Sequence, residues 1–190
     1  KGSLKAAIDS FKQALKIKPD FAEAYNSAGV ALNDKGDPEA AIDSYKNAIK
    51  IKPDYADAYI NMGNVLSDKG SLEAAINRYK QALKFKPDSV KAHIYIGNVL
   101  NNRGDLEAAL GSYKKAISIN PNLSEAWNNL EFPLQAMKQQ VPSVDKLLSR
   151  LDLQTDSNHS QIAKSILSFS LNQGGNNAES ALNEVCKLLS

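Results

Sequence analysis

The sequence predicts an all-α solenoid of stacked antiparallel helix hairpins. Two observations lead to this fold class: a constant 34-residue interval between four prolines, and two glycine series that keep the same interval. A fixed period of this length indicates supersecondary units that stack on one another rather than a globule with one central core. The prolines are Pro19, Pro53, Pro87 and Pro121, and the glycines are Gly2, Gly36, Gly70 and Gly104, then Gly29, Gly63 and Gly97.

The first helix of the unit 20–53 is expected from Ala22 to about Lys35, where apolar residues recur at helical spacing. Asp20 is placed to cap it, and Glu23 completes a pair that resembles a capping box. Gly36 suits the left-handed residue that ends many helices.

A second helix follows at once, so the unit is a helical hairpin. Asp37 can cap this helix with Pro38 at its first position, and Pro53 ends it. Its apolar stripe is Ala40, Ala41, Ile42, Tyr45, Ala48 and Ile49.

Small residues mark the expected helix contacts. Glycines of the first helix are predicted to meet alanines of the second, with tyrosines beside them, and a further alanine column is predicted to pack on the next unit. The alanines at the tight crossing are Ala41, Ala75 and Ala109; the tyrosines are Tyr45, Tyr79 and Tyr113; the further alanines are Ala14, Ala48, Ala82 and Ala116.

The repeated pattern has an aromatic residue four positions before glycine, followed by alanine, an aromatic residue, alanine and proline at fixed offsets. This pattern resembles the tetratricopeptide repeat (TPR) family. Residues 20–53, 54–87 and 88–121 match it, residues 1–19 match only the second helix of a truncated repeat, and 122–141 match a degenerate half repeat. The resemblance implies a right-handed superhelix whose concave face, lined by the first helices, binds peptides or partner proteins.

Both ends depart from the period. The stripe on residues 1–19 (Leu4, Ala7, Ile8, Phe11 and Leu15) lacks half its covering, which predicts either a fragment of a longer repeat protein or self-association through this helix.

Near the other end, Glu131 replaces the glycine, which is expected to open that crossing, and Pro133 is expected to kink or stop the helix. Residues 142–190 are interpreted as a helical cap, or the start of a following module, with helices near 143–151, 159–173 and 178–189.

Composition excludes several classes of function. Charged residues make up 23% and the net charge is +2, with no basic stripe interleaved with aromatic residues, so we expect no nucleic acid partner. No apolar run is long enough to span a membrane, and no metal spacing, phosphate loop or activated nucleophile can be assembled, so we expect no cofactor and no enzyme activity. The lone Cys186 fits a reducing compartment, hence a cytoplasmic location, and the excess of Lys and Asn suits a bacterial source.

The candidate binding residues emerge when the units are aligned by their first-helix glycines. Amide side chains dominate the positions expected to face the groove, and an amide can both accept from a peptide N–H and donate to its C=O. The predicted peptide-binding residues are Asn26, Asn61, Asn64, Tyr95, Asn98, Asn101 and Asn129. Ile94 and Ile60 are expected to add apolar anchorage.

Asn61 and Asn129 also resemble rungs of the asparagine ladder in the repeats of protein O-linked N-acetylglucosamine transferases, although Ser27 and Tyr95 interrupt the column. A groove that clamps a terminal carboxylate would need lysine three residues before the glycine. Asn26, Ile60 and Ile94 occupy that place, which argues against such a clamp.

The leading hypothesis is a non-catalytic protein–protein interaction module that binds an extended peptide or partner segment on its concave face. One alternative is the substrate-recruiting arm of a larger glycosyl- or sulfotransferase, and another is a self-assembling repeat scaffold. His93, at the position of Tyr25 and Tyr59, is interpreted as a packed substitute for an aromatic residue rather than a ligand or base.

Overall fold

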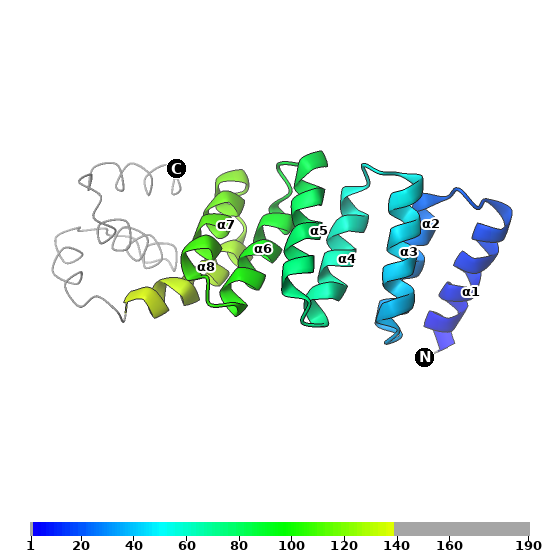
Figure 1. The fold of residues 1–190 in the computed structure, drawn as a ribbon, viewed down its shortest axis with the longest axis horizontal. Helices are drawn as coiled ribbons and strands as arrows, with labels where there is room; N and C mark the ends of the chain where they lie inside the picture. The colour runs from blue at the N-terminus through cyan, green and yellow to red at the C-terminus, as the bar shows by residue number, and fades with distance from the viewer. Residues whose placement is uncertain (1, 139–190) are drawn as a thin grey trace. The chain divides into compact units, whose positions relative to one another are not determined.

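The computed structural model describes residues 2–138, and this part of the chain contains eight α-helices and no strands (Figure 1). None of these helices is long and apolar enough to cross a membrane. The helices predicted near 143–151, 159–173 and 178–189, together with Cys186, lie outside the described residues. In chain order the helices are α1 (Gly2–Ile17), α2 (Ala22–Asp34), α3 (Pro38–Ile51), α4 (Ala56–Asp68), α5 (Leu72–Phe85), α6 (Val90–Asn102), α7 (Leu106–Ile119) and α8 (Ser124–Lys138).

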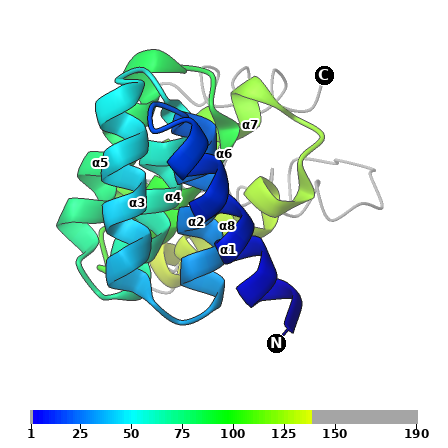
Figure 2. The same ribbon diagram turned by 90° about the vertical axis from the view of Figure 1, so that its right-hand side faces the viewer.

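The chain forms two compact units, Lys1–Tyr95 and Ile96–Ser190, which we call unit 1 and unit 2. In unit 1, α2 packs on α3 and α4 packs on α5, so that each predicted repeat is a helical hairpin, and α3 also packs on α4 of the next hairpin. Figure 2 shows the second helices α3 and α5 on one side of the first helices α2 and α4.

The turn inside each hairpin has the geometry that glycine permits. Gly36, Gly70 and Gly104 have φ values of +88°, +75° and +83°, in the left-handed region that residues with a Cβ seldom adopt. After α2, the Gly36 N–H donates to the Asn33 carbonyl at 2.8 Å and the Asp37 N–H to the Leu32 carbonyl at 2.9 Å. This pair of bonds is the Schellman motif, and it satisfies carbonyls that the helix end would leave unpaired.

The start of α3 confirms the predicted cap, whereas the start of α2 does not. Asp37 accepts a hydrogen bond from the Ala40 N–H at 3.2 Å, with Pro38 in the first turn. At α2 the N-cap is Phe21, without a side-chain hydrogen bond, so the prediction that Asp20 caps this helix was wrong. The physical reason is that Asp20 belongs to the turn after Pro19, and the Phe21 carbonyl accepts the first helical hydrogen bond.

The tight crossing within each hairpin contains a close contact between glycine and tyrosine. A Cβ added to Gly29 would lie 2.5 Å from Tyr45 Cε1, one on Gly63 2.4 Å from Tyr79 Cε1, and one on Gly97 2.4 Å from Tyr113 Cε1. The tyrosines predicted beside the crossing thus make its closest contacts, and the predicted meeting of glycine with alanine stays a prediction.

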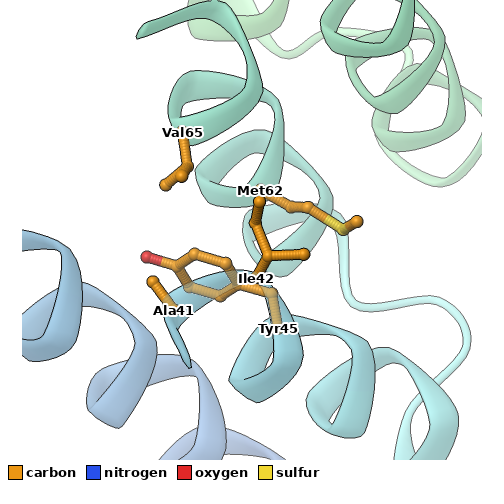
Figure 3. Close-up of a cluster of buried hydrophobic side chains, with 5 residues drawn as sticks. All are labelled: Ala41, Ile42, Tyr45, Met62 and Val65. Atoms are coloured by element: carbon orange, nitrogen blue, oxygen red, sulfur yellow. The ribbon is translucent and has the colours of Figure 1, made fainter. Parts of the chain in front are cut away.

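The core continues from one hairpin to the next through alanine and tyrosine. Figure 3 shows Ala41, Ile42 and Tyr45 of α3 against Met62 and Val65 of α4, a buried cluster that joins two repeats. Six of the alanines in the predicted columns have no exposed surface: Ala41, Ala75 and Ala109, then Ala48, Ala82 and Ala116. Ala14, the first member of the second column, is half-buried.

The helices at the two ends differ in detail from the sequence predictions. Gly2, which the period makes a turn glycine, is instead the first residue of α1. Along α1, Ile8 is buried and the other members of the predicted stripe are half-buried, because α2 packs against this helix. Ile17, which lies outside the stripe, is 86% exposed.

At the other end, α8 runs through Pro133 to Lys138, so the helix does not stop there, and the alternative of a kink at Pro133 stays a prediction. Proline costs about 3 kcal/mol inside a helix, but burial of Trp127 and Leu130 holds α8 in place. The side chain of Glu131 lies outside the described residues, so the predicted opening of its crossing stays a prediction.

Gly63→Ala is expected to lower the free energy of unfolding by about 1–3 kcal/mol, because the new methyl group overlaps the Tyr79 ring. Chemical denaturation followed by circular dichroism measures the change.

Gly111→Ala is the matched control, because a Cβ on this exposed residue of α7 meets nothing within 4 Å. It should raise stability by about 0.5–1 kcal/mol through helix propensity alone. Equal effects of the two substitutions would contradict a close contact at Gly63.

Candidate functional site

In the first helices α4, α6 and α8, a ring side chain contacts the proline carbonyl of the preceding turn. The Tyr59 hydroxyl donates to the Pro53 carbonyl at 3.2 Å, and the Trp127 Nε1–H donates to the Pro121 carbonyl at 2.8 Å. His93 Nε2 makes the same contact with the Pro87 carbonyl at 3.1 Å. This shared contact confirms the interpretation of His93 as a substitute for an aromatic residue.

In unit 1, two of the predicted binding residues bond to each other. Asn61 Nδ2 on α4 donates to Asn26 Oδ1 on α2 at 3.0 Å, and both residues are partly buried. The bond places the two amides side by side on the first-helix side of unit 1. The carbonyl oxygen of Asn61 is left available to accept from a ligand N–H.

Asn64 is oriented by the tyrosine of its own hairpin. The Tyr79 hydroxyl donates to Asn64 Oδ1 at 2.9 Å. Since this bond directs the amide oxygen toward α5, the amide NH₂ group is the part of Asn64 that remains for a ligand. Burial, then the neighbouring Tyr95 and Asp68, raises the pKa of Tyr79, so its hydroxyl stays protonated and can donate.

Tyr95, in the first turns of α6, completes this group of side chains. Its ring lies 5.7 Å from the Tyr79 ring with an interplanar angle of 43°, and it is partly exposed. We call Asn26, Asn61, Asn64 and Tyr95 the unit 1 patch. It combines amide hydrogen-bonding groups with one aromatic face.

In unit 2, the Asn98 amide is held from two sides. Its Oδ1 accepts from the Tyr113 hydroxyl at 2.8 Å and from Asn129 Nδ2 at 3.1 Å. Both lone pairs of that oxygen are engaged, so Asn98 offers a ligand only N–H groups. Burial raises the pKa of Tyr113 to about 12, which keeps this donor protonated at neutral pH.

Asn101 lies one turn further along α6, and its Oδ1 is buried without a hydrogen-bond partner among the described residues. We call Asn98, Asn101 and Asn129 the unit 2 patch. The structure thus divides the predicted binding residues between two patches, each within its own unit.

Two predicted anchors are not available to a ligand. Ile60 is 5% exposed and Ile94 is 1% exposed, so the expectation that they add apolar anchorage was wrong. Both are core residues of their hairpins.

The tyrosine partners of Asn64 and Asn98 were missed at the sequence level. The signal was present, because an asparagine directly after the helix glycine coincides with a tyrosine 15 residues later in both repeats, at Asn64 and Tyr79 and at Asn98 and Tyr113.

Comparison with known families agrees with this architecture. A family model described as TPR repeat matches residues 1–36, 29–70, 63–102 and 97–130. The chain therefore belongs to the TPR repeat family, and its helical hairpins form a repeat solenoid of that class. No curated protein matches the chain.

Solved structures share the fold. A crystal structure of MamA is 22% identical, with a TM-score of 0.69, and the match covers 90% of this chain and 92% of MamA. MamA 41-end from Desulfovibrio magneticus RS-1 is 20% identical over 82% of this chain and 89% of its own, with a TM-score of 0.65. The first TPR of Spaghetti (RPAP3), bound to the HSP90 peptide SRMEEVD, is 22% identical over 61% of this chain and 92% of its own, with a TM-score of 0.59.

Tyr79→Phe is expected to lower the free energy of unfolding by about 0.5–1.5 kcal/mol, because the hydrogen bond to Asn64 is lost. Differential scanning calorimetry measures the change.

Tyr45→Phe is the matched control. The residue equivalent to Asn64 in that hairpin is Val30, so the Tyr45 hydroxyl has no amide partner at that place, and the substitution should be close to neutral. If both substitutions cost the same, the bond to Asn64 contributes nothing.

Proposed function

We propose that this chain is a non-catalytic protein–protein interaction module that binds an extended peptide through the amide side chains of its first helices. The observation that carries the proposal is the fixed orientation of Asn64 and Asn98. Each has its amide oxygen held by a buried tyrosine, which leaves N–H donors for a ligand. An extended peptide presents carbonyl oxygens at regular intervals, and these are the acceptors that such donors match.

Hydrogen bonds to amides limit the strength of this binding. A neutral hydrogen bond contributes about 0.5–1.5 kcal/mol net, so each patch holds a peptide weakly without further contacts. In unit 1 the Tyr95 ring supplies an aromatic surface for a peptide side chain. Three amides and one ring together contribute at most about 5–6 kcal/mol, so the expected dissociation constant is about 0.1 mM or weaker.

The RPAP3 structure supports peptide binding by a TPR of this fold, since it holds a peptide with two glutamates and a final aspartate. This chain differs in its charged residues. Neither α2 nor α4 contains lysine, arginine or histidine, so unit 1 offers no cation on those helices to bind a terminal carboxylate.

Replacement of Asn61 by alanine is expected to weaken the binding of an extended peptide to the unit 1 patch about two- to ten-fold, because one amide is lost. Peptides are first selected on the immobilised chain from a random-sequence library, and the affinity is then measured by fluorescence anisotropy. Asn61 is chosen because it bonds to Asn26, whereas replacement of Asn64 would remove the partner of Tyr79.

The control replaces Asn47 and Asn77, which are exposed on the second helices α3 and α5, by alanine. This variant should bind the selected peptide as the unaltered chain does. Equal affinity of all three proteins would refute binding through the first-helix amides.

A second candidate function is self-association through α1, and one observation favours it. Ile17 is 86% exposed, the largest exposure among the large hydrophobic residues of the described chain. Sedimentation velocity over a range of concentrations should show dimers that Ile17→Glu abolishes. A monomer at every concentration would exclude this function.

A further inference from the structure

Charged side chains in unit 1 are divided by helix type. The first helices α2 and α4 carry only acidic residues, namely Glu23, Asp34, Asp57 and Asp68. Lysines lie on α1, α3 and α5, in the turns, and at the start of α6, where Lys91 precedes Tyr95 by one turn. The surface formed by α2 and α4 therefore has a negative charge, although the whole chain has a net charge of +2.

One of these carboxylates lies beside a patch residue, and a second occupies the equivalent position of the preceding repeat, next to Val30. Asp68 follows Asn64 by one helical turn and so shares its face of α4. Asp34 has the same position on α2 in the preceding repeat. The carboxylates of Asp34 and Asp68 also contribute to the raised pKa values of Tyr45 and Tyr79, which places each carboxylate near the tyrosine of its own hairpin.

Neighbouring cations leave these two aspartates unpaired. Lys69, next to Asp68 in sequence, pairs with Glu39 on α3 instead. Lys52 pairs with Glu23 at 3.4 Å. Neither Asp34 nor Asp68 has an ion-pair partner among the described residues, so each keeps an exposed negative charge, Asp68 beside Asn64 and Asp34 beside Val30.

We propose that the unit 1 patch selects an extended peptide segment that carries lysine or arginine side chains and discriminates against acidic segments. The inference rests on the proposed function and names the chemistry of its partner. The Asn64 N–H groups bind the peptide backbone, while Asp34 and Asp68 attract the basic side chains. The partly exposed Tyr95 ring accepts a cation on its face.

A positive charge on the ligand is preferred because no cation on α2 or α4 compensates the charges of Asp34 and Asp68. A carboxylate on the ligand would approach Asp34 and Asp68 with no lysine or arginine on α2 or α4 to offset the repulsion. A basic side chain meets the opposite field. Charge complementarity of this kind determines which partners a surface accepts and how fast they associate.

The test uses three pools of short synthetic peptides that share randomised apolar positions and differ only at the charged positions. These positions are all lysine, all glutamine or all glutamate. Each pool is applied to the immobilised full chain, bound peptide is quantified by mass spectrometry, and the best members are measured by fluorescence anisotropy. The lysine pool should bind best and the glutamate pool worst.

The variant Asp34→Asn with Asp68→Asn removes both charges and keeps the side-chain shape. It should bind lysine peptides about five-fold more weakly and glutamine peptides unchanged. The matched control is Asp9→Asn with Asp43→Asn, which removes two exposed charges from α1 and α3 and should keep the preference for lysine.

Each outcome is decisive. Glutamine peptides that bind as well as lysine peptides, and that respond to Asn61→Ala, would overturn the charge preference and leave the proposed function intact. A lysine preference that survives in the Asp34 and Asp68 variant would also overturn it. Failure of every pool to bind would overturn this inference and the proposed function together.

Discussion

The contact between a helix glycine and a tyrosine ring is the constraint on which the rest of the structure depends. At Gly29, Gly63 and Gly97, the missing side chain lets the ring lie where a Cβ would overlap it. The two helices of a hairpin can then approach closely, and the tyrosine is buried between them. Because interiors are packed densely, the same spacing must recur in every repeat that stacks on the next.

This buried tyrosine also links packing to the candidate site. Its ring fills the core of the hairpin, while its hydroxyl reaches an amide on the first-helix side, as with Tyr79 and Asn64 or Tyr113 and Asn98. A core residue thereby orients a surface residue. The asparagine loses rotamer freedom in the free protein, so less conformational entropy is lost when a ligand binds.

Some positions hold the same residue in every repeat of this chain, whereas others differ from repeat to repeat. Positions that pack, such as the buried alanines, are the same in each repeat because any larger side chain would not fit. Positions beside the amides differ: Asn61, Tyr95 and Asn129 occupy one repeat position in three successive repeats, and Val30, Asn64 and Asn98 occupy another. These differences give each unit its own chemistry on a common framework.

The sequence by itself determined the fold class, the hairpin boundaries and the turns, because each depends on local properties: a 34-residue period, helical spacing, and glycine at positive φ in Gly36. Tertiary structure decided which side chains meet. Only packing shows that Gly63 faces Tyr79, that Ile94 is buried, or that α8 continues through Pro133. Residue type and spacing define a helix face, but its neighbours are set by how separate helices come together in space.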